Sequence, residues 1–389
     1  MMGLRKLLDR AKPNFSAGGR YAKLHSTFEA FETFLFTPNT VTAKGSHIRD
    51  AVDMKRTMIV VVVALLPALV FGMYNAGLQH ARFLGQSIDF WPALGFGFLK
   101  MLPTIIVSYV VGLGIEFAVA QARGHEVNEG FLVSGLLIPM VLPIGIPLWM
   151  VALATAFAVV FGKEVFGGTG MNVFNPALVA RAFLFFAFPK YMSGDGVWIA
   201  GMGVERGVDG FSGATPLAQA AAGLTDHLPK AYDLFMGFIP GSVGETSTLM
   251  VLIGAVILLA TGVSSWRVTL SVFAGGILMG LLFNAIGANS YMQLPAYYHL
   301  LMGGFAFGAV FMATDPVTGA QTKTGQWIYG LLIGIFTVMV RVINPAYPEG
   351  MMLSILLMNA AAPLIDYLVV GQNIRGRRKR AARVEAERA

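Results

Sequence analysis

Hydrophobic residues in this chain are gathered in long blocks and do not alternate with polar residues at helical or strand spacing. The stretches Thr57–Gln79, Thr246–Trp266 and Val268–Thr314 contain no Asp, Glu, Lys or Arg. A helix needs about 20 apolar residues to cross the hydrocarbon core of a bilayer, so each stretch holds at least one span. The pattern therefore predicts an all-α polytopic membrane protein.

The apolar blocks divide into ten predicted membrane spans. The first block begins near Thr57, beyond the 15–30 residues in which a cleaved signal peptide would lie, so we expect no such signal. The predicted spans cover residues 57–77, 96–120, 128–143, 147–165, 175–190, 246–265, 268–287, 297–314, 326–343 and 351–370.

The charged residues fit this topology. Only 13% of the 389 residues are charged, about half of the roughly 25% found in soluble domains. Ten Lys and Arg precede Thr57 and seven follow Gly371, and cytoplasmic segments flanking spans are rich in basic residues. Ten spans place 21 Lys and Arg on the cytoplasmic side and five outside. We therefore expect both termini in the cytoplasm, and we attribute the net charge of +7 to topology and not to nucleic-acid binding.

Interrupted spans suggest an internal repeat. The charge-free stretch Gly130–Gly162 contains three prolines, and irregular backbone at membrane depth is tolerated where it is buried or lines a cavity. The tripeptide Asn-Pro-Ala opens the fifth predicted span at Asn175 and the tenth at Asn344. Interruptions at equivalent places in two halves indicate inverted repeats around a binding site. We predict two inverted five-helix repeats with broken helices.

The predicted spans divide the chain into five segments. The first is amphipathic and basic, and it either lies on the membrane surface or docks on a partner. The segments are residues 1–56 (cytoplasmic extension), 57–190 (first half), 191–245 (external loop), 246–371 (second half) and 372–389 (basic cytoplasmic tail).

Cysteine is absent, which excludes a disulfide, a thiolate nucleophile and a cysteine-ligated iron–sulfur cluster in this chain. The six histidines are scattered, so the sequence gives no reason to expect a dedicated transition-metal site.

The external loop holds one motif with chemical content, Asp209–Leu217 (DGFSGATPL). Its small residues leave room for a bulky ligand to approach the backbone, and Thr215 offers a hydroxyl. From these residues alone, the segment is a turn-rich loop with a hydroxyl group, and an ordinary linker would explain it equally well.

The motif resembles the sequence at which FMN is joined to threonine by a phosphoester in the NqrB/RnfD family. This family comprises one membrane subunit of the sodium-translocating NADH:quinone oxidoreductase and its counterpart in the related Rnf complex. The resemblance extends over nearly the whole chain. It includes HEVNEG (125–130), KEVFGGTGMNVFNPA (163–177), RAFLFFA (181–187), GGFAFGAVFMATDP (303–316) and VINPAYPEGMM (342–352).

The resemblance implies covalent FMN on Thr215, with Asp209, Gly210, Ser212, Gly213 and Ala214 forming the surrounding motif. It further implies a second, noncovalent flavin (riboflavin), ubiquinone as the electron acceptor, and export of Na⁺ across a bacterial inner membrane. The implied enzyme is a six-subunit NADH:ubiquinone reductase. Its NADH site, its iron–sulfur clusters and a neighbouring FMN-bearing subunit belong to partner chains, which agrees with the lack of cysteine here.

The second flavin has candidate ligands in the polar, glycine-rich break before the fifth predicted span. The alternative is a helix-breaking turn that satisfies its own backbone. The candidates are Gly167, Gly168, Thr169, Asn172 and Asn175.

Acidic residues within or beside spans are the remaining candidates, because a charge at the bilayer centre costs roughly 2.5–3.5 kcal/mol on insertion scales. The resemblance assigns Gly112 and Glu116 to the quinone-reducing region, whereas Glu116 could instead pair with Arg123. Asp315 and Asp366 are candidates for the Na⁺ path. Alternatively, they pair for packing with Arg181, which lies in the fifth predicted span, or with Arg341.

Two other functions fit parts of the pattern. The RnfD-type member of the Rnf complex shares the flavin motif, although the basic extension and the total length favour the quinone reductase. A urea-type solute channel would suit ten spans in inverted halves, but it needs no flavin motif in an external loop.

Overall fold

The protein is described here by a computed structural model that covers residues 2–16, 19–21, 25–36, 42, 44–46, 54–124, 130–202, 207, 212–344, 347 and 349–388. Six helices in these ranges are long and apolar enough to cross a membrane, and three shorter apolar helices accompany them. The prediction of an all-α polytopic membrane protein is therefore confirmed.

Both halves contain five consecutive apolar segments. In the first half these are α3 (Met54–Phe83), α4 (Phe90–Arg123), α5 (Phe131–Val141), α6 (Leu148–Gly162) and α7 (Pro176–Ala187). In the second half they are α11 (Thr248–Ala260), α12 (Trp266–Ile286), a broken segment, α15 (Lys323–Ile343) and α16 (Met351–Arg388).

The predicted span 297–314 is not one helix. It is divided into α13 (Tyr298–Leu301), α14 (Phe305–Phe307) and the π-helical turn η4 (Gly308–Met312). Gly303, between α13 and α14, has φ +60°, a conformation that side chains other than glycine rarely adopt. The glycine-rich sequence permits this break, so the predicted span is a broken helix.

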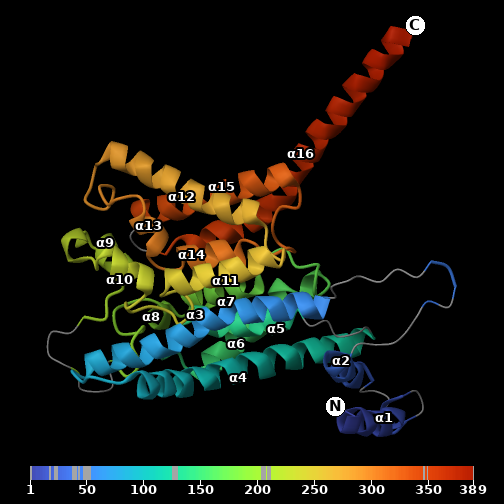
Figure 1. Cartoon of the computed structure of the whole chain (residues 1–389), viewed down its shortest axis with the longest axis horizontal. Helices are drawn as coiled ribbons and strands as arrows, with labels where there is room; N and C mark the ends of the chain where they lie inside the picture. The colour runs from blue at the N-terminus through green and yellow to red at the C-terminus, as the bar shows by residue number, and fades with distance from the viewer. Residues whose placement is uncertain are drawn as a thin grey trace.

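Two helix pairings recur in both halves, which run in opposite directions. The second segment packs against the fourth in each half, α4 on α6 and α12 on α15. The fourth packs against the fifth, α6 on α7 and α15 on α16. α3 starts at the end of the bundle beside α2, whereas α11 starts at the opposite end (Figure 1). This arrangement is that of inverted repeats.

Small residues allow the long helices to approach closely. A Cβ atom on Gly97 of α4 would lie 1.8 Å from the carbonyl oxygen of Met73 in α3. A Cβ atom on Gly334 of α15 would lie 2.1 Å from the carbonyl oxygen of Val272 in α12. Close backbone contact of this kind stabilises helix pairs in membranes through van der Waals packing.

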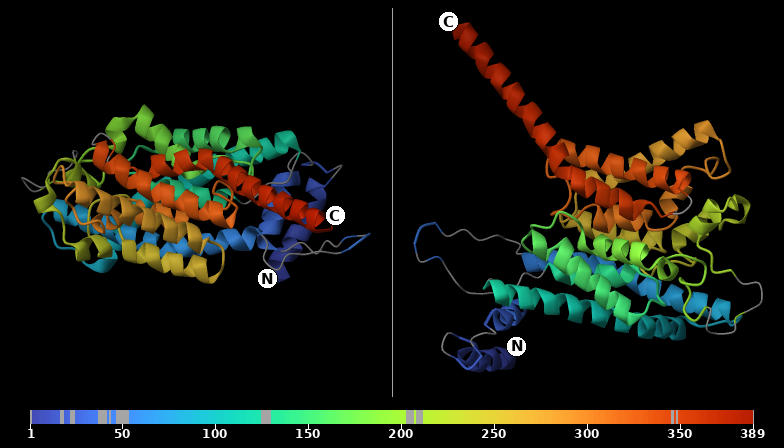
Figure 2. Two further views of the ribbon diagram at one scale, coloured as in Figure 1. Left: turned by 90° about the horizontal axis from the view of Figure 1, so that it is seen from above. Right: turned by 180° about the vertical axis from the view of Figure 1, so that it is seen from behind.

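The loop between the halves and the chain termini lie at opposite ends of the bundle. The N-terminal helices α1 (Met2–Phe15) and α2 (His25–Leu35) lie at the end toward which the C-terminal part of α16 projects (Figures 1 and 2). The loop contributes α8 (Pro189–Met192), α9 (Pro216–Ala221), η3 (Thr225–His227) and α10 (Ala231–Met236). The short turn η2 (Glu164–Phe166) follows α6, and α16 continues without a break into the basic tail.

Candidate functional site

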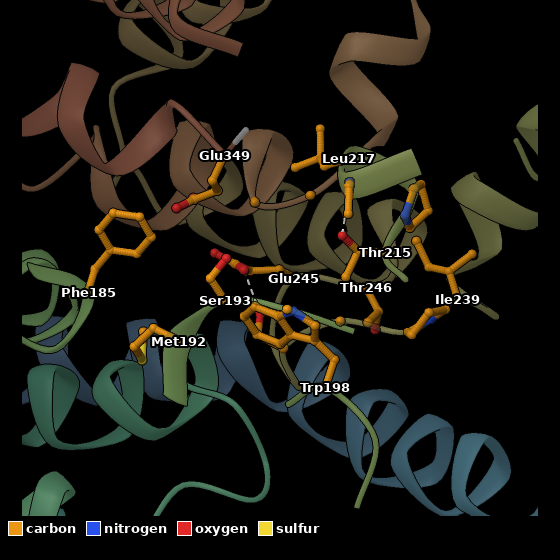
Figure 3. A pocket seen from close by; sticks show the side chains of 18 of the residues that line it. Phe185, Met192, Ser193, Trp198, Thr215, Leu217, Ile239, Glu245, Thr246 and Glu349 are labelled. Carbon is orange, nitrogen blue, oxygen red and sulfur yellow. Dashed lines mark hydrogen bonds between the residues drawn. The ribbon is translucent and has the colours of Figure 1, made fainter. Parts of the chain in front are cut away.

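Thr215 begins the helix α9 and lines a cavity. It is the N-cap residue, with Pro216 at the first helical position, and its Oγ1 accepts a hydrogen bond from the Ala218 amide over 3.2 Å. Threonine before proline is a favoured start for a helix, which explains why this segment turns helical here. The threonine is half-buried and shares the cavity with Trp198, Phe185 and Glu245 (Figure 3). We call this space the loop cavity.

Gly213 and Ser212 precede this position in the motif. Gly213 is buried, and a Cβ atom on it would lie 2.2 Å from the carbonyl oxygen of Asp195, so only glycine fits. Ser212 is exposed and its Oγ accepts a hydrogen bond from the Ala214 amide. Asp209 and Gly210 lie outside the described residues.

A buried ionic network forms one wall of the loop cavity. The Arg181 guanidinium on α7 donates to Glu245 over 2.5 Å and lies 3.3 Å from Glu349. Ser242 donates to the second oxygen of Glu245, and the Tyr347 hydroxyl donates to Glu349. Burial raises the pKa of the Glu349 carboxyl above its ordinary value, and Arg181 offsets only part of that rise. The wall thus offers a fixed cation and two carboxylates to a ligand.

The loop cavity opens to solvent, and its empty space of about 820 Å³ includes open solvent at the mouth. Gly303 and Gly304 also line it. A Cβ atom on Gly304 would lie 2.3 Å from Glu245 Oε1, so the absence of a side chain there keeps the network in place.

A second cavity lies where α3 and α7 begin, at the end of the bundle opposite α9 (Figure 1). It also has an empty volume of about 820 Å³. Thr169, Asn172 and Asn175 line it, together with Lys163 and Asp315. The structure therefore brings Asp315, a candidate for the Na⁺ path, together with three of the five candidate ligands of riboflavin. We call this space the second cavity.

Asn175 links the two sides of the second cavity. Its Oδ1 caps α7 by accepting from the amides of Ala177 and Leu178, and its Nδ2 donates to Asp315 over 3.4 Å. Asp315 also accepts from the Val317 amide and the Thr318 hydroxyl. Burial raises the pKa of the Asp315 carboxyl, and these hydrogen bonds work against the rise.

Gly167 and Gly168 do not line the second cavity. They have φ of +122° and +97°, in the region that L-amino acids with side chains rarely adopt. The two glycines therefore belong to the turn that connects η2 to α7. A turn of this kind was the alternative to a flavin-binding role that the sequence left open. The side chains of Thr169, Asn172 and Asn175 are what this turn presents to the cavity.

Glu116 is held by a cation that the sequence did not indicate. Its carboxylate accepts a hydrogen bond from the Lys163 ammonium, and both side chains are only 5% exposed. Arg123, the expected partner, instead pairs with Glu164. Gly112 lies one turn before Glu116, where a Cβ atom would lie 1.9 Å from the Phe131 ring. Lys163 therefore connects Glu116 with the second cavity.

Asp366 lines neither cavity. Its carboxylate accepts hydrogen bonds from the Gln321 amide, the Thr322 amide and the Thr322 hydroxyl. Thr322 is the N-cap of α15, so Asp366 ties α16 to the start of α15. In the part of the chain that the structure describes, no three His, Asp or Glu residues converge as a metal site.

The Asp366→Ala variant should be less stable, because it removes a charged acceptor from two backbone amides and a hydroxyl. We expect a loss of about 2 kcal/mol in the free energy of unfolding, measured by chemical denaturation in detergent. An unchanged denaturation midpoint would show that this cap contributes nothing to the fold. The role of Asp366 in sodium transport stays a separate prediction.

Some residues of the sites could not be found from sequence. Glu245, Glu349 and Trp198 come from three separate connecting segments, and only the fold brings them to Thr215. The sequence did indicate Arg181 as a charge in a predicted span, but its partners are Glu245 and Glu349 and not Asp315 or Asp366.

Known proteins resemble this chain over nearly its whole length. The model of the NQR2, RnfD, RnfE family matches residues 41–375. Three similar relatives are each named as a component of the Na(+)-translocating NADH-quinone reductase, the one designated B. They come from Chromohalobacter salexigens (47% identical over 98% of this chain and 97% of that protein), Pseudomonas paraeruginosa (48%, over 97% and 99%) and Azotobacter vinelandii (46%, over 97% and 99%).

Proposed function

Because the chain belongs to the NQR2, RnfD, RnfE family, we propose that it is the flavin-carrying membrane subunit of a sodium-translocating NADH:quinone oxidoreductase. In this proposal FMN is joined to Thr215 by a phosphoester. Electrons enter from an FMN-bearing partner subunit and leave to ubiquinone, and the transfer is coupled to export of Na⁺.

The observation that carries the proposal is the position of the Thr215 hydroxyl on the loop cavity. An attachment site needs an accessible nucleophilic oxygen beside space for the attached group. Thr215 Oγ1 accepts one hydrogen bond and donates none among the described residues, and the cavity beside it is open to solvent and lined by Trp198 and Phe185. These residues fit a tethered group with a planar ring.

The chain's own residues would hold this group. A bound flavin supplies the chemistry of accepting two electrons together and releasing them singly. Trp198 and Phe185 offer aromatic faces to a planar ring, and such contacts are worth about 0.5–1.5 kcal/mol beyond area burial. The guanidinium of Arg181 is fixed by Glu245 and Glu349, so it presents a positive charge without reorganisation.

We assign the second flavin, riboflavin, to the second cavity. Thr169, Asn172 and Asn175 offer the hydroxyl and amide groups that ring oxygens and nitrogens require, and Lys163 adds the cavity's one lining cation among the described residues. Gly112 and Glu116 stay the proposed quinone region, supported by the link from Glu116 through Lys163 to this cavity. Asp315 is the acidic residue best placed for a sodium path, because it lines the same cavity.

The alternatives are less well supported. The relatives named as components of the NADH-quinone reductase match nearly the full length of this chain, which favours that complex over the Rnf complex within the family. The same names favour a redox subunit over a solute channel.

We further propose that the N-terminal helices and the α16 tail are cytoplasmic and that the loop cavity faces the periplasm, in keeping with the excess of basic residues at both termini.

The proposal is tested by the fluorescence of the denatured polypeptide. The chain should be expressed with its flavin transferase, separated on a denaturing gel and viewed under ultraviolet light. We expect a fluorescent band, and mass spectrometry should find FMN on the peptide that contains Thr215. A dark band, or a label on another peptide, would contradict the proposal.

A further inference from the structure

Lys100 lies on the outer surface of the bundle at membrane depth. It is the only charged residue in α4 between Phe90 and Ile115, and its side chain is exposed. Neighbouring side chains on the outside of α4, among them Leu99 and Ile106, are apolar and exposed. α4 lies along the edge of the bundle farthest from α12 in Figure 1 and in the right-hand view of Figure 2.

The depth of Lys100 follows from the packing of α4 on α3. Gly97 contacts Met73 and Gly77 contacts Ala93, so the two helices are antiparallel and Lys100 is level with about Val70. The charge-free stretch Thr57–Gln79 has its midpoint near residue 68. At 1.5 Å per residue, Lys100 Cα lies about 3 Å from the level of that midpoint.

The side chain is too short to bring its charge out of the hydrocarbon region. The ammonium lies 5.6 Å from the centre of the Phe96 ring, which belongs to the preceding turn of α4. One helical turn is about 5.4 Å long, whereas the half-thickness of the hydrocarbon core is about 15 Å. A lysine at the bilayer centre costs roughly 2.5–3.5 kcal/mol, and snorkelling recovers only part of that.

Nothing in the described part of the chain neutralises this charge. The ion pairs of the described residues do not include Lys100, and its one recorded contact is the Phe96 ring. By contrast, the buried side chains of Lys163 and Arg181 are each paired with a glutamate. Lys100 differs because it faces outward.

We propose that the outer face of α4 around Lys100 is the docking surface for a transmembrane helix of another subunit, and that this helix carries an Asp or Glu level with Lys100. A carboxylate is the group that neutralises an ammonium at this depth. Exposed apolar residues before and after Lys100 along α4 supply the packing surface, and Gly95 leaves open space for close approach. This inference is independent of the flavin on Thr215.

The test is assembly of the whole complex with variants of this chain. The chain is tagged, expressed with its partner subunits, extracted in mild detergent, and its free and assembled fractions are compared by native electrophoresis. We expect Lys100→Met to weaken retention of a partner roughly tenfold or more, as for other ion pairs that lose one member. Lys100→Arg should assemble as the wild type does. Arg267→Met, which removes a charge at the start of α12, is the matched control and should also assemble normally.

A crosslink identifies the occupant. A photoreactive amino acid in place of Leu99 should crosslink to a partner peptide that contains an acidic residue within a membrane span, whereas one in place of Leu270 on α12 should not. Normal assembly of Lys100→Met, equal loss with Lys100→Arg, or crosslinks from position 99 to lipid alone would each overturn the proposal.

Discussion

Replacing Thr215 by Asn is expected to abolish the covalent flavin and, with it, NADH-driven quinone reduction by the assembled complex. Asparagine is as good an N-cap residue as threonine, so α9 should still begin at Pro216, but the side chain has no hydroxyl to form a phosphoester. Ultraviolet fluorescence of the denatured band and turnover of the purified complex measure the two effects.

The choice of asparagine separates chemistry from folding. Thr215→Ala would also remove the cap of α9, at a cost of about 0.5–2 kcal/mol, so loss of label in that variant has two explanations. Thr225→Asn makes the same exchange in the same loop, outside the motif, and should keep both label and turnover. A fluorescent Thr215→Asn band would rule out this residue as the attachment site. Normal turnover in an unlabelled variant would show that electrons do not enter through it.

Replacing Lys163 by Met should produce the largest loss of stability. Glu116 would remain in a site that is 5% exposed, without the ammonium that now donates to it. Removing one member of a buried ion pair costs about 3–5 kcal/mol, because the other charge is left uncompensated. Size-exclusion chromatography after heating should show a lower melting temperature than for the wild type.

The double variant Lys163→Met with Glu116→Gln provides the control. With both charges removed, no buried charge is left without a partner, and most of the lost stability should return. If the single and double variants have the same melting temperature, Lys163 and Glu116 do not act as a pair. The amount of noncovalent flavin released on denaturation is a second measurement. Since Lys163 lines the second cavity, the double variant should recover stability but not flavin content.

The sequence by itself determined that this chain forms apolar helices, several of them long enough to cross a membrane. A helix satisfies all the backbone hydrogen bonds of an apolar block that is long enough to cross a bilayer. Nine of the ten predicted spans contain a single apolar helix. In the exception, residues 297–314, the apolar segment is broken. Hydropathy does not locate such a break because it measures composition, whereas Gly303 and the π turn at Gly308–Met312 depend on local backbone geometry.

The sequence also singled out Thr215, through a motif that is local in the chain. Its position at the start of a helix follows from Thr-Pro alone. The two cavities were decided only by the tertiary structure. Glu245 and Glu349 meet Arg181, and Asp315 meets Asn175, across 64 to 168 residues of sequence. No local pattern carries such pairings, because they arise when two inverted halves pack and bring distant helix ends together.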